Sequence, residues 1–536
     1  MRSSGSKSIR LSLSALLARQ LAARGNEVCL IEEGETISWR AFATRVDALA
    51  DALTGQGVVA GDRVAIWLPN RSAWLATFFA CCRIGAIAVS INTRFRSGEV
   101  ADLLYRSGAK LLFYWPGFKD IDFSGILARC EPESLVHLQA VVLYAEDDRP
   151  LPQTVVGKPV VDARALLAAR QPHRATGTAE SPCVIFTTSG TTRAPKLVVH
   201  KQANVVLHAE NVARQYGYRK GHCFLLIPPF CGVFGFCNAM AAMAAGIPLI
   251  LDTTWNPPLY ANLIDRYRVT HLAGSNEAVA QLLAERTGAP PFPSIEYMVS
   301  ANINPAHADI PLRGAARGVL VYGLYGSSEL QAAMSRCEHE ADVERTGRAG
   351  GTPASSLCKV RARDPESGAV LPHGEAGELE ILAPESRFVE YLNDAEATAK
   401  AFTADGYFRT GDLGFSEADG SFTYLGRMGD TLRLGGFLVS PAEIEGVIQD
   451  HPAVEACQLV GAMTREALMP VAFIRVRTGR SVSEAEIIAF TNERLAKFKV
   501  PVKVVTLDEF PTTPSANGFK VQKNKLREMA EALLNG

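Results

Sequence analysis

The chain is poor in several features that would point to particular classes of protein. Its 11 cysteines are few for 536 residues, are scattered apart from Cys81-Cys82, and form no C-x-x-C pair. This pattern argues against a disulfide-stabilised scaffold and against a zinc site, and it predicts a reduced, cytoplasmic protein. The 55 basic and 56 acidic residues nearly cancel, without a basic stripe or an acidic tail. We therefore expect no binding to nucleic acid or to a membrane surface.

A membrane span is also not expected, although one stretch has a suitable length. His222–Leu251 contains no Asp, Glu, Lys or Arg, which by length alone would suit a span. Its prolines, among them Pro228 and Pro248, argue instead for a buried strand, loop, helix and strand. At the start of the chain, the apolar run within Met1–Ala23 is short and is broken by Arg19. We expect an amphipathic helix there rather than a targeting segment.

The length and the order of apolar patterns predict the domain organisation. A chain of 536 residues is too long for one compact core, so at least two domains are expected. Strand and helix patterns alternate up to Tyr114, which is typical of a doubly wound, mostly parallel sheet. The pattern in residues 115–180 is less regular, and we expect that segment to be peripheral. From Gly377 the pattern becomes rich in strands, and the turn Gly426–Asp430 is the best boundary.

We therefore predict an α/β protein. Residues 1–427 would form a large N-terminal domain with doubly wound, mostly parallel sheets and a β-rich subdomain, and residues 428–536 a small, mobile α+β C-terminal domain. The expected helices include 42–55, 73–82, 100–106 and 204–216, and the expected strands include 27–33, 36–39, 63–68, 87–91, 110–114, 270–273, 297–301, 319–324 and 377–382.

The densest run of hydroxyl side chains lies between two apolar segments, Cys183–Phe186 and Leu197–Val199. The run is Thr187, Thr188, Ser189, Gly190, Thr191 and Thr192, and Lys196 follows it. Backbone N–H groups near a glycine can approach an anion, hydroxyls can donate hydrogen bonds to phosphate oxygens, and the lysine adds positive charge. An ordinary polar turn explains the composition equally well. The segment is not a Walker A loop, because it lacks the second glycine and the Ser/Thr after the lysine.

The order Thr188-Ser-Gly-Thr-Thr-x-x-Pro-Lys196 resembles the signature loop of the adenylate-forming superfamily, which includes acyl-CoA synthetases, adenylation domains and beetle luciferases. Further segments match this family in the same order: Gly85-Ala86 with Asn92, Tyr325-Gly-Ser-Ser-Glu329, Gly406–Asp412, Gly426-Arg427 with Gly435-Gly436 and Pro441–Glu445, and Asn517-Gly-Phe-Lys520. The resemblance covers the chain from about residue 10 to 530, and its strength lies in the order of the motifs rather than in any one of them.

The resemblance implies that the protein activates a carboxylic acid with ATP to an acyl-adenylate and transfers the acyl group to CoA. The threonine-rich loop and Lys196 would hold the β- and γ-phosphates, and Glu329 would hold Mg²⁺. The segment Tyr325, Gly326, Ser327 and Ser328 would contribute to nucleotide binding. Asp412 would bind the ribose hydroxyls, with a further contact from Arg427. Lys520 would bridge the substrate carboxylate and the α-phosphate, and Gly436 would border the path of pantetheine. Thr188, Glu329 and Lys520 are thus the predicted catalytic residues.

Three positions depart from the family pattern in ways that bear on function. Arg193 and Leu197 stand where the family usually has glycine, and Arg193 would be strained if that position needs φ > 0. Gly429 stands where the family has Asp or Lys in the hinge, and glycine would make the hinge freer. A catalytically impaired enzyme is the minor alternative that follows from Arg193.

The resemblance also implies where the acyl group binds. Phe230–Asn238, Ser300–Asn302 and Gly323–Tyr325 would form the pocket, which Phe230, Phe234, Phe236 and Leu324 would make apolar. No Asp or Lys lies in these windows, so a fatty or aromatic acid is a better candidate than an amino acid.

Several alternatives remain open. The acceptor could be the phosphopantetheine of a separate carrier protein instead of CoA, and a luciferase-type oxygenase is a less favoured reading. A non-catalytic nucleotide-binding protein is the alternative from another class. A serine hydrolase is disfavoured because no Gly-x-Ser-x-Gly occurs. The sequence leaves a homodimer open as the assembly.

Overall fold

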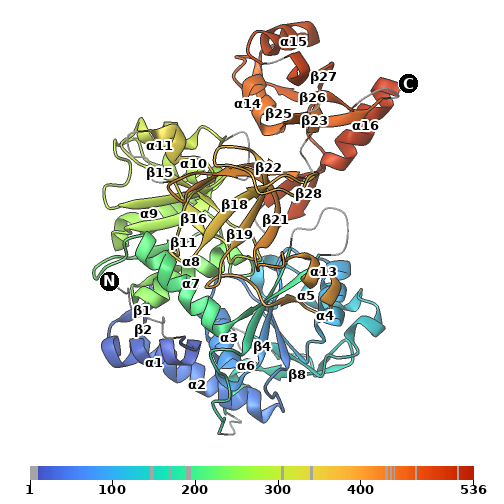
Figure 1. Ribbon diagram of the computed structural model, residues 1–536. Coiled ribbons are helices and arrows are strands. Elements are labelled where there is room, and N and C mark those ends of the chain that lie inside the picture. Colours follow the sequence, from blue (N-terminus) through green and yellow to red (C-terminus); the bar gives the residue numbers. More distant parts are fainter. Residues whose placement is uncertain are drawn as a thin grey trace.

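The computed structural model describes residues 10–144, 150–168, 172–188, 195–302, 307–337, 342–428, 432–434, 437–439, 441–464, 468–495, 497–515 and 518–535. Figure 1 shows a large part, built from the chain up to about residue 427, and a smaller C-terminal part above it. The two large sheets both lie in the large part. The predicted fold class, an α/β protein with a large N-terminal and a small C-terminal domain, is confirmed.

One large sheet carries the candidate phosphate loop at one edge. Its nine described strands follow the order β20 (Glu390–Tyr391), β10 (Leu197–Lys201), β9 (Pro182–Thr187), β4 (Ile87–Ser90), β3 (Arg63–Trp67), β5 (Leu111–Tyr114), β6 (Ala140–Leu143), β8 (Lys158–Asp162) and β7 (Thr154–Val155). The strands from β9 to β8 are parallel, whereas β10 and β20 are antiparallel to their neighbours.

The other large sheet has thirteen described strands and is half parallel. Its order is β18 (Lys359–Arg363), β19 (Gly377–Leu382), β21 (Phe408–Ser416), β22 (Phe422–Arg427), β17 (Gly350–Pro353), β16 (Ser335–Arg336), β15 (Val321–Tyr325), β14 (Tyr297–Ala301), β13 (His271–Ser275), β11 (Phe224–Leu226), β12 (Leu249–Leu251), β1 (Val28–Glu32) and β2 (Glu35–Ser38). The six strands from β15 to β1 are parallel. The antiparallel strands β16, β17, β18, β19, β21 and β22 form the predicted β-rich subdomain.

The helices of the large part cover the sheets and supply the core. They are α1 (Leu13–Arg24), α2 (Trp39–Gly55), α3 (Ser72–Ile84), α4 (Ser97–Ser107), α5 (Phe123–Ala128), α6 (Ala163–Ala168), α7 (Gln202–Gln215), α8 (Val233–Ala245), α9 (Pro257–Tyr267), α10 (Asn276–Ala284), α11 (Ile310–Ala315), α12 (Val343–Thr346) and α13 (Ala395–Lys400).

Two of these helices are apolar almost all round, α3 and α8, and they are buried on nearly every side. Phe236 of α8 packs edge-on against Phe78 of α3 at 5.1 Å and against Phe186 of β9 at 5.2 Å between ring centroids. The uncharged stretch 222–251 therefore forms a buried strand, helix and strand, as predicted. No helix in the described part of the chain has the length and apolar character needed to cross a membrane.

The expectation for residues 115–180 was wrong in part. The segment supplies β6 and β8, which extend the parallel sheet beyond β5, together with the short helices α5 and α6. Val141 and Val142 of β6 are fully buried. The error arises because an apolar run of four residues does not distinguish a strand from a buried helical turn.

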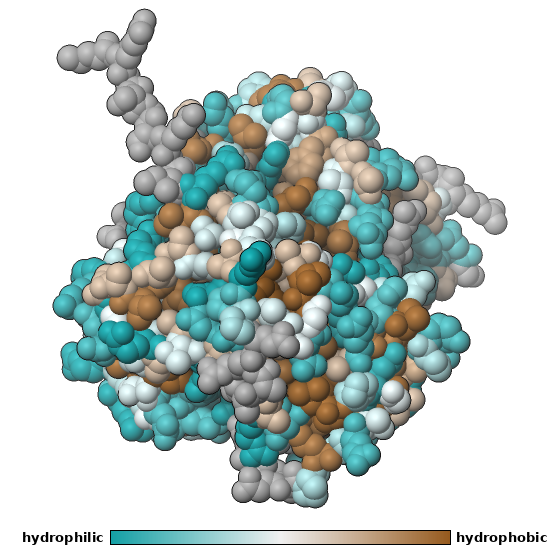
Figure 2. Space-filling view, turned by 90° about the horizontal axis from the view of Figure 1, so that it is seen from below, coloured by the Kyte–Doolittle hydropathy of each residue, from teal (hydrophilic) through white to brown (hydrophobic). Residues whose placement is uncertain are grey.

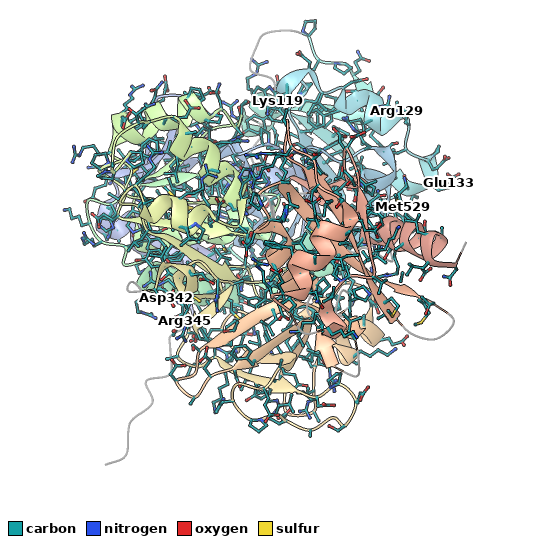
Figure 3. All side chains as sticks on the ribbon, turned by 90° about the horizontal axis from the view of Figure 1, so that it is seen from above. Lys119, Arg129, Glu133, Asp342, Arg345 and Met529 are labelled. Atoms are coloured by element: carbon teal, nitrogen blue, oxygen red, sulfur yellow. The ribbon has the colours of Figure 1, made fainter. Side chains whose placement is uncertain are left out.

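The C-terminal part has sheets of its own. β25 (Val454–Met463), β26 (Leu468–Val476) and β27 (Lys503–Thr506) form one sheet, which α14 (Pro441–Gln449), α15 (Glu484–Asn492) and α16 (Lys523–Asn535) accompany. Two hairpins complete it: β23 (Leu432–Leu434) with β24 (Phe437–Val439), and β28 (Thr512–Ser515) with β29 (Gly518–Val521). Seen from above, this part lies in front of the large part, with Lys119 and Arg129 toward one edge and Asp342 and Arg345 toward the opposite edge (Figure 3).

The distribution of hydropathy on the surface and the state of the cysteines are consistent with the balanced charge and the scattered cysteines of the sequence. Hydrophilic and hydrophobic residues are interspersed on the face seen from below (Figure 2). All eleven cysteines lie in the described residues and are free, and all but Cys358 are buried.

Candidate active site

The candidate phosphate loop connects two antiparallel strands. Thr187, the last residue of β9, pairs with Leu197, the first residue of β10. The Thr188 N–H donates to the Lys196 carbonyl at 3.0 Å, and the Lys196 N–H donates to the Thr188 hydroxyl at 3.0 Å. From α4, Arg106 Nη1 donates to the Pro195 carbonyl at 2.8 Å. The base of the loop is therefore held from both ends, while Ser189, Gly190, Thr191, Thr192 and Arg193 lie outside the described residues.

Lys196 and Glu329, which are far apart in sequence, meet at the same tyrosine. The Lys196 ammonium lies 4.4 Å from the ring centroid of Tyr391. The hydroxyl of that tyrosine donates to Glu329 Oε1 at 2.9 Å. Tyr391 ends β20, whose pairing with β10 places it opposite Val198, two residues after Lys196. The sheet edge thus brings the predicted phosphate-binding lysine to the predicted metal-binding carboxylate.

The segment that carries Glu329 folds back tightly on itself. A Cβ on Gly326 would lie 2.4 Å from the Ala332 Cα, so only glycine fits there. Gln331, Ala332 and Ala333 all have positive φ, at 64°, 52° and 35°. Such conformations are costly for residues other than glycine and persist where the surroundings fix them.

Two buried histidines help to fix this segment. His200 Nε2 lies 2.8 Å from the Ser328 carbonyl, and His208 Nε2 lies 3.0 Å from the Ala332 carbonyl. Because a carbonyl only accepts, Nε2 must carry the proton in both rings. Burial lowers the pKa of each histidine to about 4, so both are neutral near pH 7. The backbone on either side of Glu329 is held by uncharged donors.

Asp412 lies in the middle of strand β21, beside the same segment. The hydroxyl of Tyr325, the last residue of β15, donates to Asp412 Oδ2 at 2.5 Å. Arg427 pairs with Asp412 across the β21–β22 hairpin, and its Nη1 lies 3.1 Å from Oδ1. That nitrogen directs its hydrogen bond to the Thr410 carbonyl, also at 3.1 Å. Oδ1 consequently accepts no hydrogen bond from the described residues.

The surroundings of Asp412 oppose its ionisation. The pKa of this carboxyl is raised to about 6, mainly by burial and to a smaller extent by the nearby charges of Glu329 and Glu378. Arg427 and the Tyr325 hydroxyl lower the pKa, but they do not outweigh the burial, since the Arg427 side chain is half exposed. The hydroxyl of Ser327 is also buried without a hydrogen bond to a described residue. Two buried oxygens, from Asp412 and Ser327, are thus left for a ligand to satisfy.

The two remaining predicted residues belong to the C-terminal part. Gly436 lies outside the described residues, as does Gly429 of the expected hinge. The backbone of Lys520 is in β29, where it pairs with Thr513. The acyl windows contain tightly packed side chains: Phe230 is fully buried and stacks on Trp74 at 5.2 Å, and Phe234 is buried as well. A cavity of about 10 Å³ lies beside Ser300 and Asn302.

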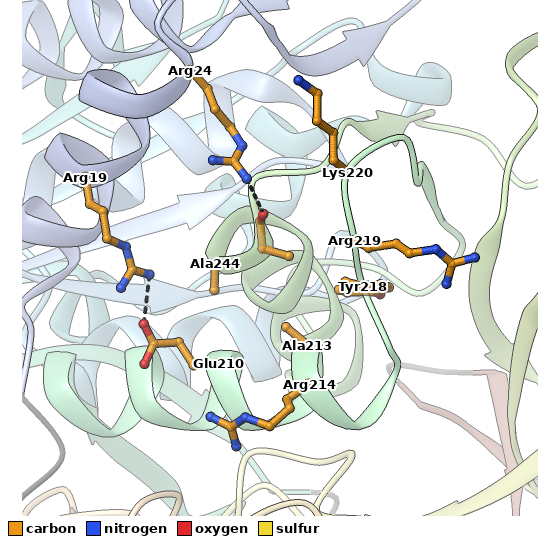
Figure 4. A pocket seen from close by; sticks show the side chains of 10 residues that line it. Arg19, Arg24, Glu210, Ala213, Arg214, Tyr218, Arg219, Lys220 and Ala244 are labelled. Carbon is orange, nitrogen blue, oxygen red and sulfur yellow. Dashed lines mark hydrogen bonds and ion pairs between the residues drawn. The ribbon is translucent and has the colours of Figure 1, made fainter. Parts of the chain in front are cut away.

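A hollow of about 430 Å³ lies away from this site. It lies where α1, α7 and α8 end and is lined by Arg19, Arg24, Glu210, Ala213, Arg214, Tyr218, Arg219, Lys220, Ala244 and Ala245 (Figure 4). Arg24 donates to the last carbonyls of α8, and Arg19 pairs with Glu210 at 2.8 Å. Cations at helix C-termini compensate the helix dipoles and need no ligand to explain them.

The sequence-based reasoning missed Tyr391, His200 and His208. None belongs to a motif with a predicted chemical role, although His200 lies in the strand that directly follows the phosphate loop. Tyr391 could have been found only by predicting that β20 pairs with β10, and no periodicity in the sequence gives such a long-range pairing.

Comparisons with known proteins agree with this arrangement. Residues 17–387 match the family model described as AMP-binding enzyme, and residues 443–517 match the model of the AMP-binding enzyme C-terminal domain. The chain is 30% identical over 518 residues to a 3-[(3aS,4S,7aS)-7a-methyl-1,5-dioxo-octahydro-1H-inden-4-yl]propanoyl:CoA ligase of Mycobacterium tuberculosis, covering 96% of this chain and 97% of the relative.

Further relatives act on different acids. The chain is 28% identical to a feruloyl-CoA synthase of an Amycolatopsis species, with 92% of this chain and 94% of the relative covered. Among solved structures, ATP-bound MatB from Rhodopseudomonas palustris is similar, with a TM-score of 0.84 and 25% identity over 98% of this chain and 100% of the other.

Proposed function

Because the chain belongs to the AMP-binding enzyme family, we propose that it is an AMP-forming acid–thiol ligase that converts a carboxylic acid, ATP and CoA into acyl-CoA, AMP and diphosphate. The observation that carries this proposal is the convergence of separate segments on one place. Lys196 and Glu329 meet at Tyr391, and Asp412 meets Tyr325, which lies four residues before Glu329.

In the first half-reaction, a carboxylate oxygen attacks the α-phosphorus of ATP, the bond from that phosphorus to the β-phosphate oxygen breaks, and diphosphate leaves. The main obstacle is repulsion between anions, so catalysis depends on positioning and on cations placed where charge develops. We assign Thr187, Thr188 and the hydroxyl-rich loop to the phosphates, together with Lys196. Asp412 would accept hydrogen bonds from the ribose hydroxyls, with Arg427 beside it.

The donors present fit Mg²⁺ that arrives with the nucleotide. The described residues contain no group of three or more Asp, Glu, His or Cys that would hold a metal unaided. A single carboxylate from Glu329 suits Mg²⁺, which commonly binds one or two carboxylates together with substrate phosphates and water. When bound, the ion would neutralise charge on the phosphates. Glu329 would hold it in place, and the Tyr391 hydroxyl would orient that carboxylate.

In the second half-reaction, the thiol sulfur of CoA loses its proton and attacks the acyl carbonyl carbon, and AMP leaves. We propose a boundary between residues 427 and 428 and a rotation of the C-terminal domain about the segment 427–430. Support comes from the described strands after residue 428, which form separate sheets and join neither large sheet. Lys520 would then serve the first step alone, and Gly436 would border the pantetheine path in the second.

The substrate that we propose is an apolar acid, fatty or aromatic. Three of the relatives are named for a bicyclic propanoate, ferulate and 2-succinylbenzoate, and the acyl windows here contain no Asp or Lys. A cytoplasmic location is supported by the free cysteines. A homodimer is a further proposal, which light scattering of the purified protein would test.

The decisive experiment is ATP–diphosphate exchange across a panel of aliphatic and aromatic acids, followed by thioester formation with CoA or with a holo-carrier protein. Acid-dependent exchange and a product with free CoA are expected. A product with the holo-carrier protein and none with free CoA would show that the enzyme belongs to the ligases that load carrier proteins. Absence of exchange with every acid, together with retained nucleotide binding, would refute the ligase and favour a non-catalytic nucleotide-binding protein.

The assignment of Lys520 has its own test. Lys520→Ala should slow acyl-adenylate formation by on the order of 10²–10³-fold, the scale of losing one preorganised charge-stabilising group. Thioester formation from supplied acyl-adenylate should be preserved. Equal losses in both half-reactions would refute the assignment.

A further inference from the structure

One aromatic ring stands between the two oppositely charged side chains of the site. The Lys196 ammonium lies over the Tyr391 ring, 4.4 Å from its centroid, and the hydroxyl of the same ring donates to Glu329 Oε1 at 2.9 Å. The cation is therefore held by the π face and the anion by the phenolic hydrogen. Both charges have a partner in the free protein, and the partner is a neutral side chain in each case.

The neutral partner matters because Lys196 and Glu329 have separate tasks. A direct ion pair between an ammonium and a carboxylate would neutralise both, and phosphate and Mg²⁺ would each have to displace it. A ring face holds a cation more weakly than a carboxylate does. The tyrosine can thus release the lysine to a phosphate while its hydroxyl keeps the carboxylate in place.

The position of Tyr391 is fixed by its neighbours, so the ring cannot easily turn away. Its side chain is buried, and its ring packs on Phe388 with 4.6 Å between centroids. Its backbone N–H donates to the Thr398 hydroxyl at 2.9 Å, and it pairs with Val198 across the sheet edge. Glu329 is tied to the residues just before β20, because its carbonyl accepts from the Phe388 N–H at 2.8 Å.

We propose that Tyr391 is a positioning residue for Mg–ATP: its ring keeps Lys196 and Glu329 from pairing with each other, and its hydroxyl orients Glu329 toward the metal. The inference rests on the proposed function, since it needs a nucleotide that uses both side chains. It adds a residue outside the predicted motifs.

Two substitutions separate the tasks of the ring and of the hydroxyl. Tyr391→Phe keeps the ring and its packing but removes the hydrogen bond to Glu329. We expect the Kd of Mg–ATP, measured by calorimetry, and its KM in diphosphate exchange to rise about tenfold, the scale of a hydrogen bond to a charged group. Tyr391→Leu also removes the ring face, so a larger rise is expected. Raised salt should reduce the difference in the Kd of Mg–ATP between the two variants. Without the ring, Lys196 would pair with Glu329, and salt would screen this ion pair because Lys196 is exposed.

Tyr407, which directly precedes β21, provides a matched control. Tyr407 lies under the Arg361 guanidinium with 3.8 Å to its ring centroid, in a cation–π pair that contains none of the site residues. Tyr407→Phe should leave the Kd and KM of Mg–ATP unchanged. In a Glu329→Gln background, Tyr391→Phe should have little further effect on Mg–ATP binding, because the carboxylate that the hydroxyl orients toward the metal is no longer present.

The outcomes are distinguishable. A purely structural role for Tyr391 would lower the melting temperature and the yield without changing the Kd of Mg–ATP, and that result would overturn the inference while leaving the ligase intact. The same conclusion would follow if Tyr391→Phe weakened binding equally in wild-type and Glu329→Gln protein. If the leucine variant does not fold, the phenylalanine variant decides, since it conserves the packing. Absence of exchange by the wild type with every acid would count against the proposed function instead, and the binding measurement would still test Tyr391.

Discussion

Replacing Asp412 by asparagine should make the free protein more stable and the nucleotide complex weaker. Asp412 is buried, and burial raises its pKa from 3.8 to about 6. The native state therefore binds an additional proton between about pH 4 and pH 6 that the unfolded chain has lost. By linkage, this group destabilises the native state progressively as the pH rises through that window, and the full cost is present above it.

The magnitude follows from the pKa. Each pKa unit corresponds to about 1.4 kcal/mol, so the difference between 3.8 and about 6 corresponds to on the order of 3 kcal/mol at neutral pH. Asparagine should recover only part of this, about 1–2 kcal/mol, because its amide NH2 is a donor that faces the Arg427 guanidinium or the Tyr325 hydroxyl in place of a carboxylate oxygen. For a chain of this size we expect a melting temperature a few degrees higher at pH 7–8.

The assay is the melting temperature of both proteins from pH 4 to pH 8, with and without Mg–ATP. The difference between Asp412→Asn and wild type should be small near pH 4 and should grow to a plateau above pH 6. Mg–ATP should raise the melting temperature of the wild type and not that of the variant, because an amide cannot replace the carboxylate as acceptor for two ribose hydroxyls. In the wild type, nucleotide affinity should fall as the pH drops below about 6.

A carboxylate at the tip of the same hairpin provides the control. The pKa of Asp419 is lowered by hydrogen bonds from Ser421. A lowered pKa stabilises the native state above the unfolded pKa and is lost on acidification, so Asp419→Asn should be neutral or destabilising at pH 7. If Asp412→Asn were destabilising across the whole range, or if both variants had the same pH dependence, the reasoning about burial would be refuted.

Three further substitutions test the supports around the site. His208→Phe leaves the Ala332 carbonyl unpaired and should cost about 1–3 kcal/mol; because burial lowers the His208 pKa to about 4, the variant should also lose less stability than wild type between pH 6.5 and pH 4, as melting curves would show. Gly326→Ala should displace the Glu329 segment, given a 2.4 Å approach to Ala332, and lower diphosphate exchange on the order of 10²-fold. Glu380→Ala removes a fully buried carboxylate that Arg361 and Arg363 contact at 2.6 and 2.7 Å; stability should fall by up to about 3–5 kcal/mol with an unchanged Kd of Mg–ATP.

The sequence predicted those parts of the fold whose signals are local. Arg63–Trp67 and Tyr297–Ala301 are strands and Trp39–Gly55 is a helix, within a residue or a few of the expected bounds, because period and capping residues act over short distances. Ser38 caps that helix by accepting from the Ala41 N–H. The short strand Ala140–Leu143 was not predicted, since its pairing with the strands on both sides determines its conformation.

The candidate site divides in the same way. The order of the motifs predicted that Lys196, Glu329 and Asp412 belong to one site. The Tyr391 ring contacts Lys196, the Tyr391 hydroxyl donates to Glu329, and the Tyr325 hydroxyl donates to Asp412. The linking tyrosine at 391 was not predictable, because its position depends on the pairing of β20 with β10. The raised pKa of Asp412 was likewise missed, since a motif does not report how deeply a side chain is buried.

In the free protein, several features that lower its stability lie together at the candidate site. The Asp412 carboxyl is ionised near pH 7 although its burial favours the protonated form. The Ser327 hydroxyl and Asp412 Oδ1 accept no hydrogen bond from the described residues. The residues Gln331 to Ala333 have a left-handed backbone conformation. A hydroxyl-bearing or cationic ligand can offset the first two of these features by donating hydrogen bonds or positive charge to these oxygens, whereas the surrounding structure has to hold the strained backbone. Stability and nucleotide affinity should therefore change in opposite directions at Asp412 and Ser327. They should fall together at His208, where the side chain supports the segment and has no ligand to meet.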